Sequence, residues 1–408
     1  MTPLALDLPG VPSTLLEELR LAAQHAGVRR LALVGGAVRD ALLHRHHGHP
    51  WLGVPDLDLV VEGHAEHLAA ALRERCGPKR LSRCLSHPAF GTVELCLDGL
   101  PLDLATARAE VYPAPGRNPQ VTPGSLQADL KHRDFTINAM ALDLISGELI
   151  DPFGGCVHLE ARQLVFLHRN SVSDDPTRLI RAARYGARLG FGLDPSSLEQ
   201  LNNTIAAWPW AWRSGDPPSQ APPALATRCR MELDRLFTNE PWELALHHLE
   251  RWGALPLIDS ALQGDSTWRR RLHWAVRLGL PLLPAWLAGA IDPLATARRL
   301  QIPGQHQQWL QQLLELRVWL RSSAPSDQAA PSRWTVALES LGCQPEAVAL
   351  LICERPAQWR LLLRWWGRWC HCLSPITARQ LLAEGWQPGP DLGAELKRRR
   401  LAVIDQGR

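Results

Sequence analysis

Lysine is almost missing from this chain of 408 residues, which carries only Lys79, Lys131 and Lys397 among its 44 lysines and arginines. Arginine therefore supplies the positive charge, which suits planar, bidentate contacts to phosphates and base edges, although a biased genomic composition explains the same preference. The formal net charge is only +3, which excludes a strongly basic protein. Any affinity for nucleic acid must come from local patches.

Paired cysteines and long apolar runs are missing as well. The nine cysteines include no Cys-x-x-Cys pair, and Cys370 and Cys372 lack the second pair of a zinc cluster, so they are interpreted as buried thiols. The odd cysteine count and the lack of a signal peptide predict a reducing compartment, the cytoplasm. No apolar run approaches the length of a membrane span, so no membrane partner is expected.

What the chain does contain is ordinary for a globular protein with a sizeable core, with 46% hydrophobic and 21% charged residues. Its length allows two or more domains. Most of the 17 tryptophans follow residue 200, where helical periodicity prevails, and they are interpreted mainly as core residues. For the alternating Trp208, Trp210 and Trp212, two interpretations stay open: stacking on RNA bases, or a loop that docks on the preceding helices.

An acidic pair in a buried strand is the signal around which the other motifs gather. Asp56 and Asp58 lie in segment 54–63, whose leucines and valines are typical of a buried strand. Side chains alternate between strand faces, so both carboxylates are expected on one face. Such a pair repels unless a cation lies between them, and Mg²⁺ binds through one or two carboxylates plus substrate phosphates. The alternative for an isolated Asp-x-Asp is a solvated turn.

A glycine turn precedes the acidic pair. Residues 31–34 are expected to form a short buried strand, Gly35-Gly36 a tight turn and residues 37–43 a helix. Free N–H groups and the positive dipole end of such a helix suit a triphosphate, and Arg39 adds charge in the first turn. The alternative is a plain strand-turn-helix corner. A phosphate cradle followed by a two-carboxylate strand is the arrangement that a nucleotidyl transferase needs.

A third acid follows on a predicted hairpin. Asp98-Gly99 is a hairpin signal between strands expected over 90–97 and 100–104. Asp103 stands among apolar neighbours on the second strand, either as a third carboxylate for the metal pair or as an edge-strand residue that faces water. Residues 106–126 are expected to be a long functional or mobile loop.

A helix opening at Asp174, with Pro176 at its first helical position, carries an arginine stripe. At about 100° per residue, its arginines share roughly a third of the circumference. The stripe consists of Arg178, Arg181, Arg184 and Arg188. Such a stripe is commonly only a solvated face. Here Asp175 and Arg178 supply an acceptor and donors one turn apart, a combination that can hydrogen-bond the Watson–Crick edge of a base.

Together these segments resemble the class II (bacterial-type) tRNA nucleotidyltransferase and poly(A) polymerase family. The matching segments are Leu33-Val-Gly-Gly-Ala-Val-Arg-Asp40, Asp56-Leu-Asp58, Arg133-Asp-Phe-Thr-Ile-Asn-Ala-Met140, Asp151-Pro-Phe-Gly-Gly155 and Asp174-Asp-Pro-Thr-Arg-Leu-Ile-Arg-Ala-Ala-Arg184. Their order and density over residues 30–192 make the resemblance specific. Weaker similarity continues at 228–233 and in the tail.

The resemblance implies an α+β fold, with a polymerase-β-like nucleotidyltransferase head of a small mixed sheet and helices. An all-helical neck, body and tail follow the head. We expect the catalytic head over residues 1–156, the nucleotide-selecting and RNA-binding neck over 157–255, and the tRNA-binding body and tail over 256–408.

The resemblance also implies site residues. Asp56 and Asp58 hold the Mg²⁺ ions that activate the RNA 3′-hydroxyl and stabilise the leaving pyrophosphate. The implied nucleotide-binding residues are Gly36 and Arg39 for the triphosphate, Arg133 for the incoming nucleotide, Asp175 and Arg178 for its base, and Arg181 and Arg184 as support. The family usually has Glu where Asp174 stands and often Arg where His132 stands, which leaves base choice open.

The implied reaction transfers CMP and/or AMP from CTP or ATP to the 3′ end of the tRNA acceptor stem and releases pyrophosphate. The segment between Asp103 and Arg133 resembles a loop that CC-adding enzymes of the family tend to lack, which favours a CCA- or A-adding enzyme. One alternative is a poly(A) polymerase acting on broader RNA 3′ ends. Another is a non-catalytic RNA-binding relative, against which the intact Asp56 and Asp58 argue. The oligomeric state is not predicted.

Overall fold

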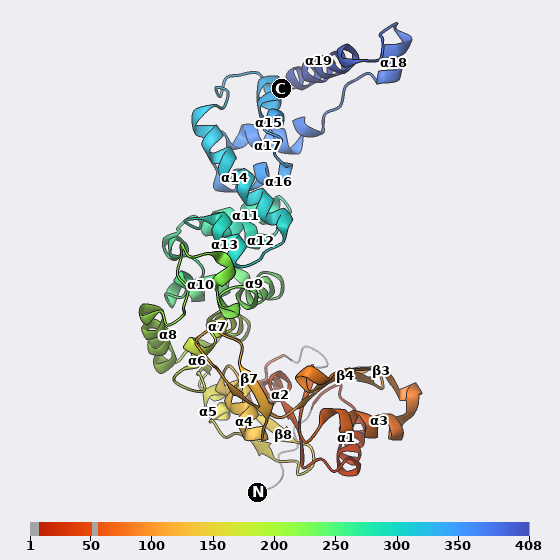
Figure 1. Ribbon diagram of the computed structural model, residues 1–408, viewed down its shortest axis with the longest axis vertical. Coiled ribbons are helices and arrows are strands. Elements are labelled where there is room, and N and C mark those ends of the chain that lie inside the picture. The colour runs from red at the N-terminus through yellow and green to blue at the C-terminus, as the bar shows by residue number, and fades with distance from the viewer. Residues whose placement is uncertain (1–7, 51–55, 408) are drawn as a thin grey trace. The chain divides into compact units, whose positions relative to one another are not determined.

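The computed structural model describes residues 8–50 and 56–407, and their contacts divide the chain into two units (Figure 1). Unit 1 is Met1–Arg213 with Pro222–Ala254, and unit 2 is Ser214–Ala221 with Leu255–Arg408. The division into head, neck, and body with tail stays a prediction. Residues 54 and 55, at the start of the predicted acidic strand, lie outside the described residues.

Unit 1 contains a mixed sheet of seven strands in the order β3-β4-β5-β2-β1-β8-β9. β2 runs parallel to β5, and every other neighbouring pair is antiparallel. The strands are β1 (Arg30–Val34), β2 (Leu57–Glu62), β3 (Leu81–His87), β4 (Thr92–Leu97), β5 (Leu100–Thr106), β8 (Ala141–Asp143) and β9 (Leu149–Ile150). This mixed sheet and the many helices confirm the predicted α+β class.

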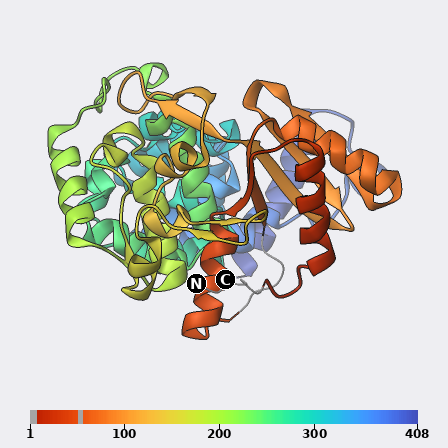
Figure 2. The same ribbon diagram turned by 90° about the horizontal axis from the view of Figure 1, so that it is seen from below.

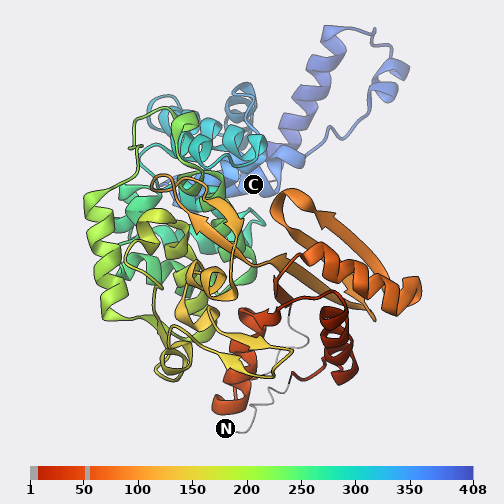
Figure 3. The same ribbon diagram turned by 60° about the horizontal axis from the view of Figure 1, so that its bottom comes forward.

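Alternation along the strands gives the sheet two apolar faces. In β2, Leu59 is buried on one face, while Asp58 and Val60 point to the other. The helices α1 (Ser13–His25) and α3 (Ala65–Arg80) pack against each other beside the strands, dark red and orange in Figures 2 and 3.

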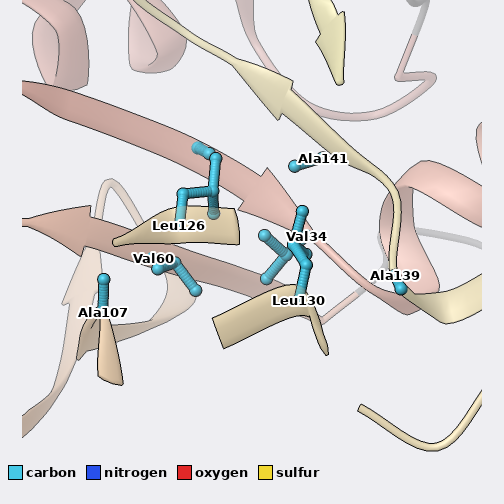
Figure 4. Close-up of a cluster of buried hydrophobic side chains, with 8 residues drawn as sticks. Val34, Val60, Ala107, Leu126, Leu130, Ala139 and Ala141 are labelled. Carbon is cyan, nitrogen blue, oxygen red and sulfur yellow. The ribbon is translucent and has the colours of Figure 1, made fainter. Parts of the chain in front are cut away.

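A compact apolar cluster covers the face that carries Asp58. In Figure 4, Leu126 and Leu130 of α4 (Leu126–Lys131) lie over Val34 and Val60 of the sheet. Each buried leucine contributes about 2 kcal/mol through its removal from water. The face of Asp58 is therefore rigid, with α4 fixed directly beside it.

The segment over 106–126, predicted to be a long functional or mobile loop, contains two short strands that the sequence analysis did not predict. β6 (Arg108–Val111) and β7 (Gln120–Pro123) form an antiparallel ribbon, and α4 begins at Leu126. Backbone pairing between the two short strands satisfies hydrogen-bonding groups that a bare loop would leave to water. The ribbon therefore gives the segment a defined shape.

Within the sheet region of unit 1, α2 (Gly36–His47) connects β1 to the segment before β2. The helices that follow the sheet in the chain are α5 (Gly155–Glu160), α6 (Ser171–Asp174), α7 (Thr177–Leu189), α8 (Pro195–Ala207), α9 (Thr227–Asn239) and α10 (Trp242–Arg251). α7 packs against α9 and α10. The parallel pair β10 (Gln163–Leu164) and β11 (Gly192–Leu193) lies on either side of α6 and α7 in sequence.

The helix predicted to open at the Asp174-Asp-Pro segment, with Pro176 at its first helical position, begins one residue later, and a short helix precedes it. Asp174 ends the short helix α6, and α7 starts at Thr177. Asp175 follows α6, and its Oδ1 accepts the backbone N–H of Thr177, the first residue of α7, at 3.1 Å.

The alternating tryptophans dock within unit 1. Trp210 and Trp212 are buried, and Nε1 of Trp210 donates to the carbonyl of Ser173 at 2.9 Å. A Cβ at Gly116, in the turn between β6 and β7, would lie 2.9 Å from Cδ1 of Trp210. The docking interpretation is confirmed for Trp210, and its indole fixes the tip of the β6–β7 ribbon.

Unit 2 is helical and centres on α16, whose residues 347–353 are all buried. Its helices are α11 (Trp268–Arg277), α12 (Leu282–Leu287), α13 (Pro293–Arg299), α14 (Gly304–Ser322), α15 (Pro331–Ser340), α16 (Pro345–Glu354), α17 (Trp359–Gly367), α18 (Ala378–Ala383) and α19 (Pro390–Gln406). Trp286 and Trp334 are fully buried, as the core interpretation predicted. Of the helices in the described chain, none alone has the length and apolarity to cross a membrane; α15 and α16 meet the criterion only jointly, across a 116° bend.

Candidate active site

The glycine turn, one carboxylate and one arginine converge at the end of β1. Gly35 has φ +70° and ψ −128°, a conformation that glycine adopts without strain. A Cβ at this position would lie 3.0 Å from Nη1 of Arg133 and 4.0 Å from Oδ2 of Asp58. Glycine is therefore needed at residue 35 both for the turn and for the close approach of Arg133. Gly36 follows as the first residue of α2.

The acidic residues cluster as the sequence predicted for Asp58 and left open for Asp103. Asp58 of β2 and Asp103 of β5 are register partners in parallel strands, so their side chains share one face. β5 lies between β4 and β2, so Asp103 is not on an edge strand, but its side chain is exposed to water, as that alternative expected. Asp56 is exposed just before β2 begins.

The carboxylates influence one another electrostatically. Burial raises the pKa of Asp58, the charge of Arg133 opposes this rise, and the charges of Asp103 and Asp56 reinforce it. The pKa of Asp103 is also raised, first by burial and then by Glu94 and Asp56. Concentrated negative charge of this kind is stabilised by a bound cation.

These residues fit a divalent metal ion whose remaining ligands come from the bound substrate. Within residues 8–50 and 56–407, no set of three or more histidine, cysteine or acidic side chains is arranged to enclose an ion. Two neighbouring carboxylates next to a glycine turn match the way in which Mg²⁺ binds, through one or two carboxylates and the phosphates of a nucleotide. The donor set therefore fits Mg²⁺ together with a triphosphate.

A cavity of about 400 Å³ opens on the same face. Val60 and Ala105 line it, and each lies two residues beyond an acid, Asp58 on β2 and Asp103 on β5. The other lining residues include Arg133, Asp175, Arg178, Arg181 and Arg228. Four of the seven predicted nucleotide-binding residues thus surround one cavity, beside the acidic face.

Arg133 joins the acidic cluster to this cavity. Its Nη1 faces the glycine turn, while its Nη2 donates to Oδ2 of Asp129 at 3.3 Å. Its Nε is buried and has no hydrogen-bond partner within the described chain. A buried donor without an acceptor is unfavourable unless a bound molecule supplies one. Arg133 is therefore a candidate contact for a phosphate or sugar oxygen.

Asp175 and Arg178, the predicted base-selecting pair, are both buried at the start of α7. They do not bond each other: Arg178 donates to the backbone carbonyls of His132 at 2.8 Å and Ser171 at 3.3 Å. Asp174 is half-buried, and its carboxylate forms no hydrogen bond within the described chain. Burial raises the pKa of Asp174, and the nearby positive charge of Arg178 opposes that rise.

In the arginine stripe on α7, Arg178 and Arg184 are buried, whereas Arg181 is half-buried and Arg188 is exposed. Arg181 donates to Oδ2 of Asp134 at 2.8 Å, and Arg184 binds Glu240 at 3.1 Å. Arg184 also pairs with Glu232, which comes from α9. Only Arg181 of these two predicted support residues lines the cavity; Arg184 fastens α7 to its neighbours.

Arg39 does not present a free guanidinium to a phosphate. It is 3% exposed, with two hydrogen bonds to Asp40 at 2.8 and 3.0 Å and one to Asn138 at 2.8 Å. Its guanidinium lies 5.2 Å from the ring centre of Tyr185, on α7. Arg39 thus uses its hydrogen bonds to connect α2, which follows the glycine turn, to Asn138. Its predicted contact with the triphosphate stays a prediction.

Several site residues were missed because their partners are distant in sequence. Asn138 donates to Asp134 at 2.9 Å, which completes a buried chain from Arg39 to Arg181. Tyr185 also contacts Arg181 and Arg188 through its ring, at 5.9 and 5.6 Å.

Comparison with known proteins follows the same motifs. A family model described as the poly A polymerase head domain matches residues 31–165. The CC-adding tRNA nucleotidyltransferase of Deinococcus radiodurans is 35% identical over 374 residues, covering 90% of this chain and 82% of that protein. The A-adding tRNA nucleotidyltransferase of Aquifex aeolicus is 43% identical over 179 residues, but these cover 43% of this chain and 20% of that protein.

Solved structures agree in fold. The apo form II of a CCA-adding enzyme matches with a TM-score of 0.73 at 22% identity, covering 97% of this chain and 93% of that one. The Thermotoga maritima CCA-adding enzyme complexed with tRNA matches with a TM-score of 0.68 at 22% identity, covering 98% and 93%. The architecture is thus shared over nearly the whole chain.

Proposed function

The chain belongs to the tRNA nucleotidyltransferase family, and we propose that it transfers CMP and/or AMP from CTP or ATP to the 3′ end of tRNA, with release of pyrophosphate. Near-complete coverage of the Deinococcus radiodurans relative at 35% identity carries the family assignment. The observation that supports the chemistry most directly is the convergence of Gly35, Asp58 and Arg133 beside a cavity lined by Asp175 and Arg178.

The proposed roles of the residues follow from their positions. The turn at Gly35 and the first N–H groups of α2, from Gly36 onward, bind the triphosphate. Arg133 donates to the sugar or a phosphate from its position between turn and cavity. Asp175 and Arg178 select the base, and Arg181, held by Asp134, keeps the cavity wall in place.

Asp56 and Asp58 are the proposed holders of Mg²⁺, and Asp103 is a proposed third carboxylate because it is the register partner of Asp58. Bound metal would lower the pKa of the attacking 3′-hydroxyl and neutralise charge on the leaving pyrophosphate. The rigid face formed by β2, β5 and α4 orients the carboxylates before substrate arrives, so little reorganisation is needed during reaction.

Two observations favour different answers to the question of which nucleotides the protein adds. The β6–β7 ribbon fills the segment whose retention favours a CCA- or A-adding enzyme, which is our first candidate. The relative that matches most of this chain is named as CC-adding, which makes a CC-adding enzyme the second candidate.

All nine cysteines are free thiols, which supports a reducing, cytoplasmic setting.

The deciding experiment uses the purified full chain, Mg²⁺, labelled CTP or ATP, and tRNA transcripts that end in the discriminator base, in C or in CC. If all three transcripts are extended to a complete CCA end, the protein is a CCA-adding enzyme. If only the CC transcript is extended, by ATP, it is an A-adding enzyme, and if extension stops at CC, it is a CC-adding enzyme. Long A tails on unrelated RNA would indicate a poly(A) polymerase. No incorporation at all would leave a non-catalytic RNA-binding protein and remove the proposal.

The carboxylate assignment has its own test. Asp56→Ala and Asp58→Ala should each lower incorporation by about 10³-fold or more, because each removes a metal ligand while tRNA binding persists. Glu17→Ala, at an exposed carboxylate on α1, is the matched control and should leave turnover unchanged. Retained turnover in Asp58→Ala would remove the metal assignment.

A further inference from the structure

Arg228 enters the nucleotide cavity from a different element than the predicted base-selecting pair. It lies near the start of α9, it lines the cavity, and its Nη2 pairs with Oδ2 of Asp175. Its Nη1 is buried and lacks a hydrogen-bond partner among the residues that the structure describes. A charged donor that ends unpaired in a nucleotide-sized cavity is expected to meet an acceptor on the ligand.

The hydrogen bonds of Asp175 make Arg228 important for base selection. A carboxylate accepts about four hydrogen bonds, two on each oxygen. Oδ1 of Asp175 already accepts the N–H of Thr177 at 3.1 Å and its hydroxyl at 2.6 Å. Oδ2 accepts from Arg228 alone, so the acceptor position that remains for a base is on the oxygen that Arg228 holds.

We propose that Arg228 is a specificity-determining positioning residue: it fixes Oδ2 of Asp175 toward the amino group of a cytosine or adenine and completes the base edge with its own free Nη1–H. This inference rests on the proposed function, because it deepens the role of the same cavity. Arg178 supplies less of this edge in the present structure, since its amino groups donate to the carbonyls of His132 and Ser171.

The chemistry of the bases provides a sharp probe. Cytosine carries an amino donor at C4 and an acceptor at N3, where uracil carries a carbonyl acceptor and an N–H donor. Adenine and guanine differ in the same sense at C6 and N1, and guanine also has an amino group at C2. A fixed acceptor oxygen on Asp175 bonds the amino group and repels the carbonyl. Loss of Arg228 should therefore weaken CTP or ATP and leave UTP and GTP, which do not use the contact, unchanged.

The experiment measures binding of CTP, UTP, ATP and GTP to the full chain with Mg²⁺ by titration calorimetry, together with kcat and KM on tRNA. Arg228→Gln should reduce affinity for the amino-bearing nucleotide by about tenfold, the worth of one charge-assisted hydrogen bond. The preference over its carbonyl counterpart should fall by the same factor. Arg228→Lys, which keeps the charge but not the planar fork, should recover part of it.

The matched control is Arg230→Gln, two residues further along α9. Arg230 pairs with Asp234 of its own helix at 3.1 Å and does not line the cavity. It should leave the binding of all four nucleotides unchanged. In the Asp175→Asn background, Arg228→Gln should lower the preference by a smaller factor than in the wild type, because the part of its effect that acts through Asp175 is already lost.

A purely structural role for Arg228 gives a different pattern. Arg228→Gln would then weaken all four nucleotides equally, or lower thermal stability with the preference intact, and either result overturns the inference. Wild-type protein that binds CTP no better than UTP, and ATP no better than GTP, overturns it as well. Protein that binds selectively but extends no tRNA would remove the proposed function and leave the role of Arg228 standing.

Discussion

Replacing Gly35 by alanine is the most direct test of the glycine turn. The backbone at φ +70° and ψ −128° is strained for any residue with a Cβ, at a cost of about 1–3 kcal/mol. The new Cβ would also lie 3.0 Å from Nη1 of Arg133, so the guanidinium must move by a few tenths of an ångström. We expect a loss of about 2–3 kcal/mol in unfolding free energy.

The expected loss of activity is larger than the loss of stability suggests. Arg133 stands between the turn and the cavity, so its displacement shifts a contact to the nucleotide as well as the turn itself. Misplacement of a reacting group by about 1 Å costs roughly 10²-fold in rate. Gly35→Ala should therefore lower kcat by about 10²-fold in labelled-nucleotide incorporation, measured below its unfolding temperature.

Gly27→Ala is the control for backbone strain alone. Gly27 also has a positive φ, +64°, but a Cβ there meets nothing within 4 Å. It should cost about 1 kcal/mol of unfolding free energy and leave incorporation unchanged. An unchanged kcat in Gly35→Ala, with folding intact by circular dichroism, would refute the proposed close approach of turn, Arg133 and substrate.

Three further predictions address other parts of unit 1. Tyr185→Leu should lower kcat while Tyr185→Phe retains it, because the ring face rather than the hydroxyl contacts Arg39, Arg181 and Arg188; equal loss in both would contradict this. Trp210→Ala should destabilise the protein by about 3–5 kcal/mol in urea unfolding, since a buried indole and its bond to Ser173 are lost. Burial, then the charges of Arg178, His132 and Lys131, lower the pKa of His168 to about 4. The unfolded chain then binds more protons between about pH 4 and 6.5, so stability should be full above pH 6.5 and fall as the pH drops toward 4, and a His168→Asn variant should lose this dependence in urea midpoints.

The elements of the sheet were predictable because their signals are local. The Asp98-Gly99 turn, the alternation in β4 and β5 and the apolar β2 follow from period and turn chemistry, and all appear where expected. The start of α7 was predicted to within one residue, at Pro176 against the observed Thr177, whereas the short helix α6 that ends at Asp174 was missed. The ribbon β6–β7 was missed because each strand has only four residues, and only pairing across the turn stabilises them.

Individual site residues were predictable from the sequence, but the contacts between them were not. The proximity of Asp103 to Asp58 depends on β5 inserting beside β2 in parallel register, which follows from sheet order and not from either segment. Pairing of the arginine stripe likewise depends on distant acids, since Glu232 of α9 and Glu240, which follows α9, are 48 and 56 residues from Arg184. Periodicity identifies a charged face, whereas its partners are decided by tertiary packing.

The hydrogen-bond network Arg39–Asn138–Asp134–Arg181 fixes the relative position of two helices more than it adds to the free energy of unfolding. A buried ion pair gains little net free energy over well-packed apolar residues, because desolvation offsets much of the attraction. Removing one partner, however, leaves a buried charge and is costly, so the helices that carry the partners are held in one relative position. Here those helices are α2, which follows the glycine turn, and α7, which carries Asp175 and Arg178 at its start. A nucleotide bound by both must have its phosphates at one and its base at the other, so the network keeps the distance between them constant while the bases change.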